Sequence, residues 1–447
     1  MLTRFPLFFA LAALPLPFVV GCGSNNPAAP DGDAGTAEGG NAEGGGGDAG
    51  ADGAAPPSSN IKHVVIIIQE NHTFDSYFGT YCTAPTGSNP TCTAGPACCE
   101  AAPATLPNDG GAPTVLNDTE NTARDPDHTQ ATELTEMNGG AMDRYLPRNV
   151  AYADPAIVAP YRAYAGMYAL ADRYFQPVVG QSSSNDMYFA RAKFVFLDNT
   201  ATPDGVSARC NNGATPTTYT DNTIADFLNA GGVSWGFYAE GYQAAVAANP
   251  GGGCPTPPAD CPLGIASYPC IYDPGDDPFA YYPATRDNAA YMHDYGQLAT
   301  DLAGTLPAVS YVKAIGYKTE HPRSPISPGV SFVTATVSAI QASKYAADTL
   351  VILTYDEGGG YFDHVTPPAT SPIDMQPYGT RVPFIAIGKF AKANFVSHLT
   401  MEHSSVVKFI EWNFLGKKTG QLGNRDTTVN NLGSLLDPSQ TGTAVPE

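Results

Sequence analysis

The sequence predicts an α/β protein built around a mostly parallel sheet, and two observations lead to this prediction. Four short apolar runs are continuous rather than alternating, as expected for strands that helices cover on both faces. Segments with helical spacing lie between and after these runs, which implies right-handed crossover connections. With 447 residues, of which 43% are hydrophobic, the chain can form one large domain with an insertion, or two domains.

The body of the protein is expected over residues 61–416. The expected strands are Val64–Ile68, Ala308–Val312, Leu350–Thr354 and Pro383–Ile387. The expected helices are Ala159–Tyr174, Ser184–Phe194, Asn222–Ala230, Phe332–Ala346 and Ser404–Leu415. Residues 201–285, rich in Gly, Pro, Tyr and Cys, break the alternation and are expected to form an inserted cap over the sheet's edge. Residues 417–447 are polar and are expected to form a peripheral tail.

The first 21 residues, MLTRFPLFFALAALPLPFVVG, carry one Arg followed by an apolar, proline-interrupted run. This pattern predicts a secretory signal rather than a membrane span. The run ends in VVGC, which favours a lipoprotein-type signal with Cys22 as the lipidated residue; a plain signal peptide is the alternative. Residues 22–60 contain almost no large apolar side chain and are expected to form a flexible Gly/Ala/Asp-rich tether.

Cysteine usage agrees with export. Besides Cys22 the chain has eight cysteines, an even number that predicts disulfides, possibly four. They fall into two groups, one after the first strand and one between Cys210 and Cys270. Zinc binding is the competing explanation, but no pair of CxxC motifs supports it.

Acidic and amide side chains follow two of the expected strands directly. Glu70 and Asn71 come after the first strand, and Asp356 and Glu357 come after Leu350–Thr354. Ligands of parallel sheets bind beyond the carboxyl ends of the strands, so these residues would converge if the strands are neighbours. Oxygen ligands suit a hard or borderline divalent cation. Either pair alone could equally belong to an exposed loop or a helix cap.

A nucleophile is expected in the segment QSSSN. Ser182, Ser183 and Ser184 lie at the start of an expected helix, where free N–H groups and the helix dipole favour an anionic phosphoryl group. A cation can also lower the pKa of a hydroxyl and so activate it. Serine is favoured as an N-cap in any case, and these arguments do not choose among the three serines.

Three histidines are candidates for acid–base chemistry. His128 in DPDHT and His321 in TEHPRS lie in polar loops, and a histidine suits protonation of a leaving alkoxide near neutral pH. His364 follows the glycine run that begins at Gly358, where the backbone can approach a bound group closely. Surface or structural histidines without a catalytic role are the alternative for each.

These motifs together resemble the bacterial phosphoesterase family that holds non-specific phospholipases C and a group of acid phosphatases. The matching segments are QENHTFDSYFG, DPDHT, QSSSN, EHP, TYDEGGGYFDHVTPP and VPFIAIG, in order along the body. The resemblance implies an alkaline-phosphatase-like α/β/α sandwich with one divalent metal ion held by Glu70, Asn71, Asp356, Glu357 and Ser182.

The resemblance also assigns roles to single residues. A Ser or Thr nucleophile three residues before an Asn points to Ser182, with Asn185 beside the substrate. His128 and His321 match histidines that contact the phosphoryl group or protonate the leaving group. Relatives commonly have Pro where Ser184 stands and often have His where Ser76 stands.

The expected activity is therefore metal-dependent hydrolysis of phosphoric esters through a phosphoseryl intermediate, of phospholipase C type on phospholipid head groups. An acid phosphatase acting on phosphomonoesters is the alternative, and a non-catalytic, ligand-binding surface lipoprotein is the candidate from another class. The net charge of −21 argues against nucleic acid as a partner and against electrostatic docking on anionic lipid. The protein is expected to be exported, either secreted or attached to the cell envelope through its N-terminal anchor.

Overall fold

The computed structural model describes residues 54–211 and 216–447. The expected signal segment, Cys22 and the tether up to residue 53 lie outside the described residues. Among the helices that are described, none is both long and apolar enough to cross a bilayer.

Eight strands form the central sheet, in the spatial order β12-β4-β11-β10-β1-β9-β7-β8. Two small sheets, β2–β3 and β5–β6, lie outside it. The strands are β1 His63–Gln69, β2 Thr114–Leu116, β3 Ala151–Ala153, β4 Ala169–Ala171, β5 Thr202–Pro203, β6 Pro216–Thr217, β7 Trp235–Ala239, β8 Met292–Asp294, β9 Val309–Lys313, β10 Thr349–Tyr355, β11 Phe384–Ile387 and β12 Phe395–Ser397. Within the central sheet only β11 runs against its neighbours, so the predicted mostly parallel sheet is confirmed.

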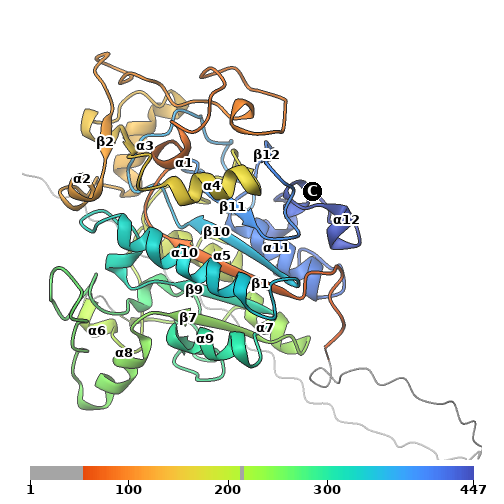
Figure 1. Ribbon diagram of the computed structural model, residues 1–447. Coiled ribbons are helices and arrows are strands. Elements are labelled where there is room, and N and C mark those ends of the chain that lie inside the picture. The colour runs from red at the N-terminus through yellow and green to blue at the C-terminus, as the bar shows by residue number, and fades with distance from the viewer. Residues whose placement is uncertain (1–53, 212–215) are drawn as a thin grey trace, which may run out of the picture. The chain divides into compact units, whose positions relative to one another are not determined.

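Helices cover both faces of this sheet (Figure 1). On one face α10 contacts both α4 and α9, and on the other α5, α7 and α11 contact one another. The helices are α1 Phe74–Phe78, α2 Asp118–Thr122, α3 Gln130–Met137, α4 Ala159–Met167, α5 Ser182–Arg191, α6 Ala208–Asn211, α7 Ile224–Ala230, α8 Tyr242–Ala248, α9 Gly296–Ala303, α10 Ser327–Ala342, α11 His403–Phe414 and α12 Pro438–Thr441. The three-layer arrangement is the predicted α/β/α sandwich.

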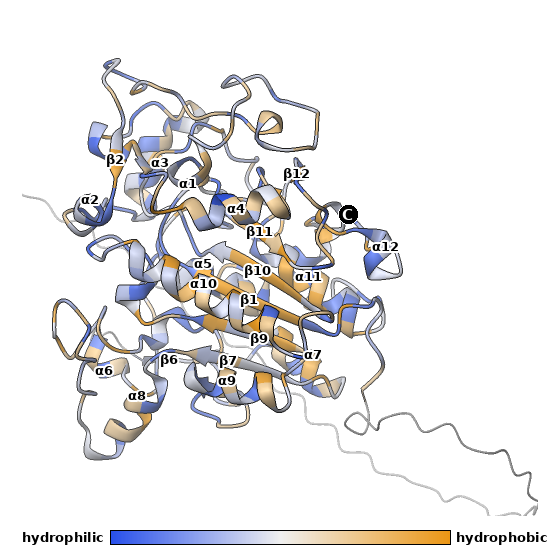
Figure 2. Ribbon diagram, viewed as in Figure 1, coloured by the Kyte–Doolittle hydropathy of each residue, from blue (hydrophilic) through white to orange (hydrophobic). Residues whose placement is uncertain are grey.

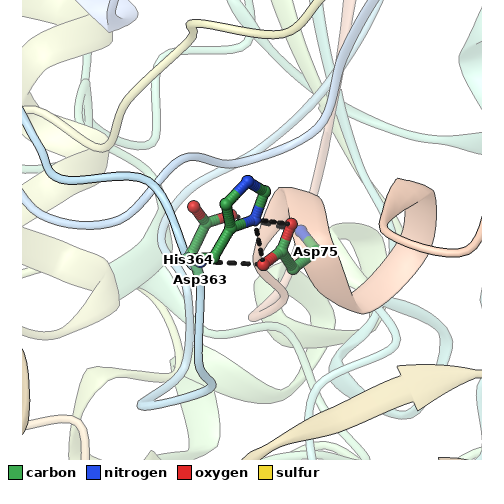
Figure 3. Close-up of side chains that lie close together, drawn as sticks. All are labelled: Asp75, Asp363 and His364. Carbon is green, nitrogen blue, oxygen red and sulfur yellow. Dashed lines mark hydrogen bonds and ion pairs between the residues drawn. The ribbon is translucent and has the colours of Figure 1, made fainter. Parts of the chain in front are cut away.

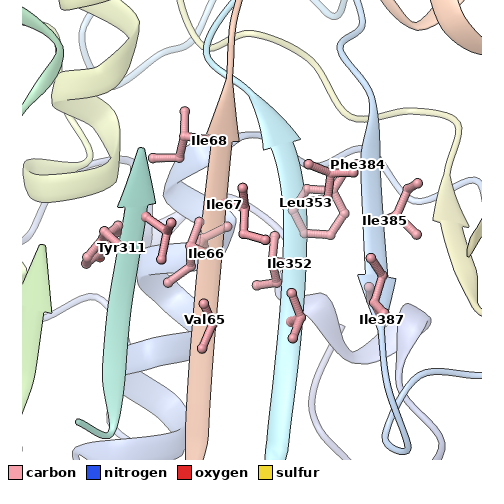
Figure 4. Close-up of a cluster of buried hydrophobic side chains, with 14 of the residues drawn as sticks. Val65, Ile66, Ile67, Ile68, Tyr311, Ile352, Leu353, Phe384, Ile385 and Ile387 are labelled. Carbon is pink, nitrogen blue, oxygen red and sulfur yellow. The ribbon is translucent and has the colours of Figure 1, made fainter. Parts of the chain in front are cut away.

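The middle of the sheet is apolar on both faces. Val64 to Ile68 of β1 are all fully buried, as is most of the neighbouring strand β10. Their side chains point alternately into the two helical layers, and Figure 4 shows Ile66, Ile67 and Ile352 among them. Figure 2 shows the same strands as the most hydrophobic part of the ribbon. A continuous apolar run is therefore what this position in the sheet requires.

Two expectations about single segments within the body are wrong. The expected helix Ala159–Tyr174 ends at Met167, because the chain continues into the buried strand β4. Strand β7 lies inside the segment 201–285 yet pairs with β9, so part of the expected cap belongs to the central sheet. Its sequence WGFYA is short and contains Gly, which weakens the strand signal.

The C-terminal segment is not peripheral. Leu432, Leu435 and Leu436 belong to the main hydrophobic core. Arg425 is fully buried, and its Nη2 lies 2.7 Å from Oδ1 of Asp374. Residues 417–447 therefore contribute to the stability of the body.

Four disulfides link the eight cysteines of the described chain, as the even count predicts. The pairs are Cys82–Cys99, Cys92–Cys98, Cys210–Cys254 and Cys261–Cys270. The first two lie within the segment that follows α1, and the other two lie within the segment 201–285.

A buried carboxylate holds the loop that follows β9. The Glu320 side chain accepts hydrogen bonds from the hydroxyls of Tyr77 (2.5 Å), Tyr355 (2.6 Å) and Tyr161. Its backbone has a positive φ of 76°, and its carbonyl accepts a bond from Asn121 Nδ2 (2.9 Å). A non-glycine residue keeps such a conformation only where its surroundings enforce it. The tyrosine network therefore fixes the backbone just before the following loop.

We expect Glu320→Gln to change how stability depends on pH. Burial raises the pKa of Glu320 from 4.5 to about 7, so the folded chain favours the protonated carboxyl. Protonation of Glu320 therefore contributes about 3 kcal/mol to the free energy of unfolding at pH values below the unfolded-state pKa. This contribution is lost as the pH rises through the folded-state pKa. Urea unfolding of both proteins between about pH 4 and pH 8 measures it. The wild type should lose stability relative to the variant as the pH rises, and parallel curves would contradict the prediction.

Candidate active site

The two acidic segments lie side by side because β1 and β10 are parallel neighbours in register. Gln69 pairs with Tyr355 at the ends of these strands. The ladder continues for one more bond, from Asp356 N to Gln69 O (3.1 Å). Glu70–Asn71 and Asp356–Glu357 consequently leave the sheet at the same edge, and the Asn71 Nδ2 group donates to Oε1 of Glu357 (2.8 Å).

Of the three serines, Ser182 is the one whose hydroxyl approaches these residues. It is the first residue of α5, and its Oγ lies 3.4 Å from Asn71 Oδ1 and 3.5 Å from Glu357 Oε1. The Ser184 hydroxyl instead donates to Gln181 O (2.7 Å), and the Ser183 hydroxyl bonds Tyr281. The helix N-terminus thus presents one side chain to the acidic cluster.

The carboxylates of this cluster carry more negative charge than the neighbouring protein groups neutralise. Burial and repulsion from Glu70 raise the pKa of Asp356 well above its usual value, and burial and repulsion from Asp356 do the same for Glu357. Oδ2 of Asp356 is buried without a hydrogen-bond partner among the described residues. A divalent cation held by these three carboxylates and the Asn71 amide would offset both effects.

His128 and His321 face each other beside this cluster, with ring centroids 6.0 Å apart. Nε2 of His128 lies 3.6 Å from Glu357 Oε1. Nδ1 of His128 bonds Pro126 O (2.8 Å), and Nδ1 of His321 bonds Pro322 O (2.7 Å). A carbonyl only accepts, so both Nδ1 atoms carry hydrogen, and each Nε2 can exchange a proton with another group.

The charged and polar side chains that surround Glu70 were not predicted from the sequence. Lys313 at the end of β9 places its Nζ 2.8 Å from Glu70 Oε1 and 3.1 Å from Asp186 Oδ2. Burial alone would raise the pKa of Glu70, but Lys313 holds it below the usual value. Tyr268 of the expected cap donates to Glu70 Oε2 (3.0 Å). A single lysine at the end of a strand has no pattern that distinguishes it, so no signal in the sequence pointed to Lys313.

Two residues expected to bind substrate are engaged within the protein. The Asn185 side chain accepts from Val178 N (3.1 Å) and donates to Gly180 O (2.8 Å), so it holds the turn before α5. The Gly358 N–H donates to Gln176 Oε1 (2.8 Å). The next residue, Gly359, has a φ of 66°, and a Cβ there would stand 2.4 Å from Asn71 O. The glycine run therefore allows the two acidic segments to approach closely.

His364 lies in a separate buried cluster with Asp75 and Asp363 (Figure 3). Its Nδ1 bonds Asp75 Oδ2 (2.8 Å), and its Nε2 lies 3.1 Å from a Glu100 oxygen. The ligand atoms of these three residues are close enough to hold a cation.

A guanidinium already neutralises this second cluster. Arg381 donates to Asp363 Oδ1 (2.8 Å) and to Asp75 Oδ1 (2.8 Å). Burial opposes the charge of His364, but Asp75 raises the pKa of His364 above its usual value. Asp75 and Asp363 therefore face Arg381 and His364, and Glu100 also faces Arg173 (3.6 Å). This balance of three carboxylates and three cationic groups indicates a structural ion-pair network rather than a metal site.

Comparisons with known proteins relate this chain to a family. The phosphoesterase family matches residues 61–415. Phospholipase C B of Mycobacterium tuberculosis is 26% identical over 85% of this chain and 78% of its own length. A non-hemolytic phospholipase C of Pseudomonas aeruginosa is 26% identical over 79% of this chain and 54% of its own length. A protein of the alkaline phosphatase superfamily from Vibrio parahaemolyticus aligns over 86% of this chain and 74% of its own, with 10% identity and a TM-score of 0.38. The chain therefore belongs to the phosphoesterase family and is a phosphoric ester hydrolase.

Proposed function

We propose that the protein hydrolyses phosphoric esters with one divalent cation and a phosphoseryl intermediate. The approach of the Ser182 hydroxyl to Asn71 and Glu357, within 3.5 Å of both, is the observation that carries this proposal. Glu70, Asn71, Asp356, Glu357 and Ser182 would hold the cation. When bound, it would neutralise phosphoryl charge and lower the pKa of the serine hydroxyl.

The side chains suit attack by Ser182 on phosphorus. The Ser182 hydroxyl loses its proton to solvent as its oxygen bonds to phosphorus, the bond to the leaving alcohol breaks, and the protonated Nε2 of His321 or His128 donates its proton to the alcohol oxygen. Water then attacks the phosphoserine and gives a proton to the same histidine. The bond between phosphorus and the Ser182 oxygen breaks, phosphate or a phosphomonoester is released, and the serine oxygen takes up a proton from solvent. Fixed positions and fixed charges would supply most of the rate.

We propose a phospholipase C-type diesterase on phospholipid head groups, because both named bacterial relatives are phospholipases C. An acid phosphatase acting on monoesters would use the same side chains. Hydrolysis of phosphatidylcholine against an aryl phosphate separates these two activities. A non-catalytic ligand-binding lipoprotein would hydrolyse neither. We further propose that the protein is exported and anchored through lipid on Cys22.

Ser182→Ala should lower kcat by at least about a thousandfold, because it removes the attacking oxygen. Its matched control is Ser183→Ala, whose hydroxyl faces Tyr281 and not the acidic segments. Hydrolysis of phosphatidylcholine and of an aryl phosphate measures the rates, and unfolding curves confirm that both variants fold. Near-wild-type turnover in Ser182→Ala would remove the proposed intermediate.

Asp356→Asn should lose the bound cation, whereas Asp363→Asn should retain it. Asp363 pairs with Arg381, so its replacement should instead lower the free energy of unfolding by about 3 kcal/mol. Elemental analysis of the purified variants measures the metal, and unfolding curves measure stability. Loss of metal from Asp363→Asn alone would place the cation at the His364 cluster.

A further inference from the structure

A groove of about 640 Å³ lies in the described part of the chain, outside the acidic cluster. Its lining comes from the end of α2 and the loop after it, from the loop before β3, from the segment after His321 and from the expected cap. The lining residues are Thr122, Ala123, Arg124, Asp125, Pro126, Arg148, Asn149, Leu263 and Arg323. Figure 1 shows α2 and the cap helix α6 flanking the edge of the sheet toward which β10 points.

Residues of the two loops that carry the active-site histidines line the groove, although the histidines themselves do not. Pro126, whose carbonyl bonds His128, lines the groove, and Arg323 lies two residues after His321. The Arg323 N–H donates to Asn121 O (2.9 Å) and Arg124 O (3.0 Å), which ties the two loops together. An ester bound between the histidines would therefore have its organic part next to this groove.

The charge of the groove is opposite to that of the whole protein. The chain has 22 Lys and Arg against 43 Asp and Glu, yet three lining residues are arginines and only Asp125 is acidic. Arg323, with 72% of its side chain exposed, pairs with Asp125 (3.0 Å). Arg124 is fixed by bonds to Glu120 and to Arg148 O (2.7 Å). The exposed Arg148 guanidinium has neither a hydrogen bond nor an ion pair within the described ranges.

The exposed arginines Arg148 and Arg323 of the lining suit an anion with several oxygens, whereas Arg124 is engaged by Glu120 and Arg148 O. Arginine binds phosphate and carboxylate through two parallel hydrogen bonds, and the bond geometry makes it selective for such groups. An anionic membrane is the less suitable occupant, because the groove is concave and the chain as a whole carries a net charge of −21. Leu263 is the one large apolar residue of the lining, which leaves little surface for acyl chains.

We propose that this groove binds a second anionic group, a phosphate or a carboxylate, on the organic part of the ester substrate. The inference rests on the proposed function, since it assumes that a phosphoester is held at Ser182. It narrows the substrate class to phosphoesters that carry a further negative charge. Arg148 and Arg323 select the substrate, and Arg124 positions the Arg148 backbone.

The test compares two series of alkyl phosphates of increasing chain length, one ending in a carboxylate and one in a methyl group. The ratio of their kcat/KM values reports recognition of the second charge. In the wild type this ratio should exceed one at the best chain length. Arg148→Gln and Arg323→Gln should each lower it about fivefold to tenfold, as expected for loss of one charged hydrogen bond. Arg144→Gln is the matched control, because Arg144 is exposed nearby but does not line the groove.

An unchanged ratio in both variants overturns the inference, even if Ser182-dependent hydrolysis is found. If the wild type hydrolyses neither series, calorimetry with carboxyalkyl phosphonates tests the groove alone, and hydrolysis of phosphatidylcholine and of an aryl phosphate tests the proposed function separately. Arginine-dependent binding in that experiment supports the groove, and its absence overturns it. Loss of binding to phosphatidylglycerol vesicles with an unchanged ratio would assign the arginines to a membrane surface instead.

Discussion

The site depends on the parallel, in-register pairing of β1 with β10. Both strands are buried on both faces of the sheet. A shift of one residue along either strand would turn each of its side chains toward the opposite helical layer. The pairing of Gln69 with Tyr355 then fixes where each strand ends. The acidic residues that follow these strands must therefore lie at the same edge of the sheet, even though their negative charges repel one another. Hydrophobic burial thus positions charges that would not gather on their own.

The crowding of buried carboxylates at this edge of the sheet affects the pKa values of neighbouring acidic side chains. Burial raises the pKa of Asp186 to about 7 and that of Asp273 to about 6, and Glu70 adds to both shifts. Lys313 is the basic side chain that contacts this group, and its Nζ is shared between Glu70 and Asp186. One ammonium cannot balance so many carboxylates, and a cation beside Ser182 would supply the missing charge. The network around Arg381, by contrast, is balanced by protein groups alone.

Local sequence patterns predicted the strong features of the fold and missed those that depend on tertiary contacts. The runs before Glu70 and Asp356 are long, apolar and β-branched, so the strands and their polar ends could be recognised. Asp186 and Lys313 could not be, because a single charged residue in a helix or at a strand end has no distinguishing pattern. The three serines are equivalent by composition, and only the direction of each side chain on α5 separates them. Strand β7 is short and contains Gly, and sheet membership there is decided by its neighbour β9.

The loop after β9 connects the buried network to the opening of the site. The hydroxyls of three buried tyrosines hold the Glu320 side chain, and the Glu320 backbone has a positive φ. His321 is the next residue, so its position depends on this turn. Two residues later Arg323, also at positive φ (69°), joins the loop that carries His128. One strained loop therefore sets the position of a proton donor and of a groove arginine together. A substitution that lets the Glu320 backbone leave its positive φ would move His321 and Arg323 together. Acid–base chemistry and recognition of a second anion therefore depend on the same loop.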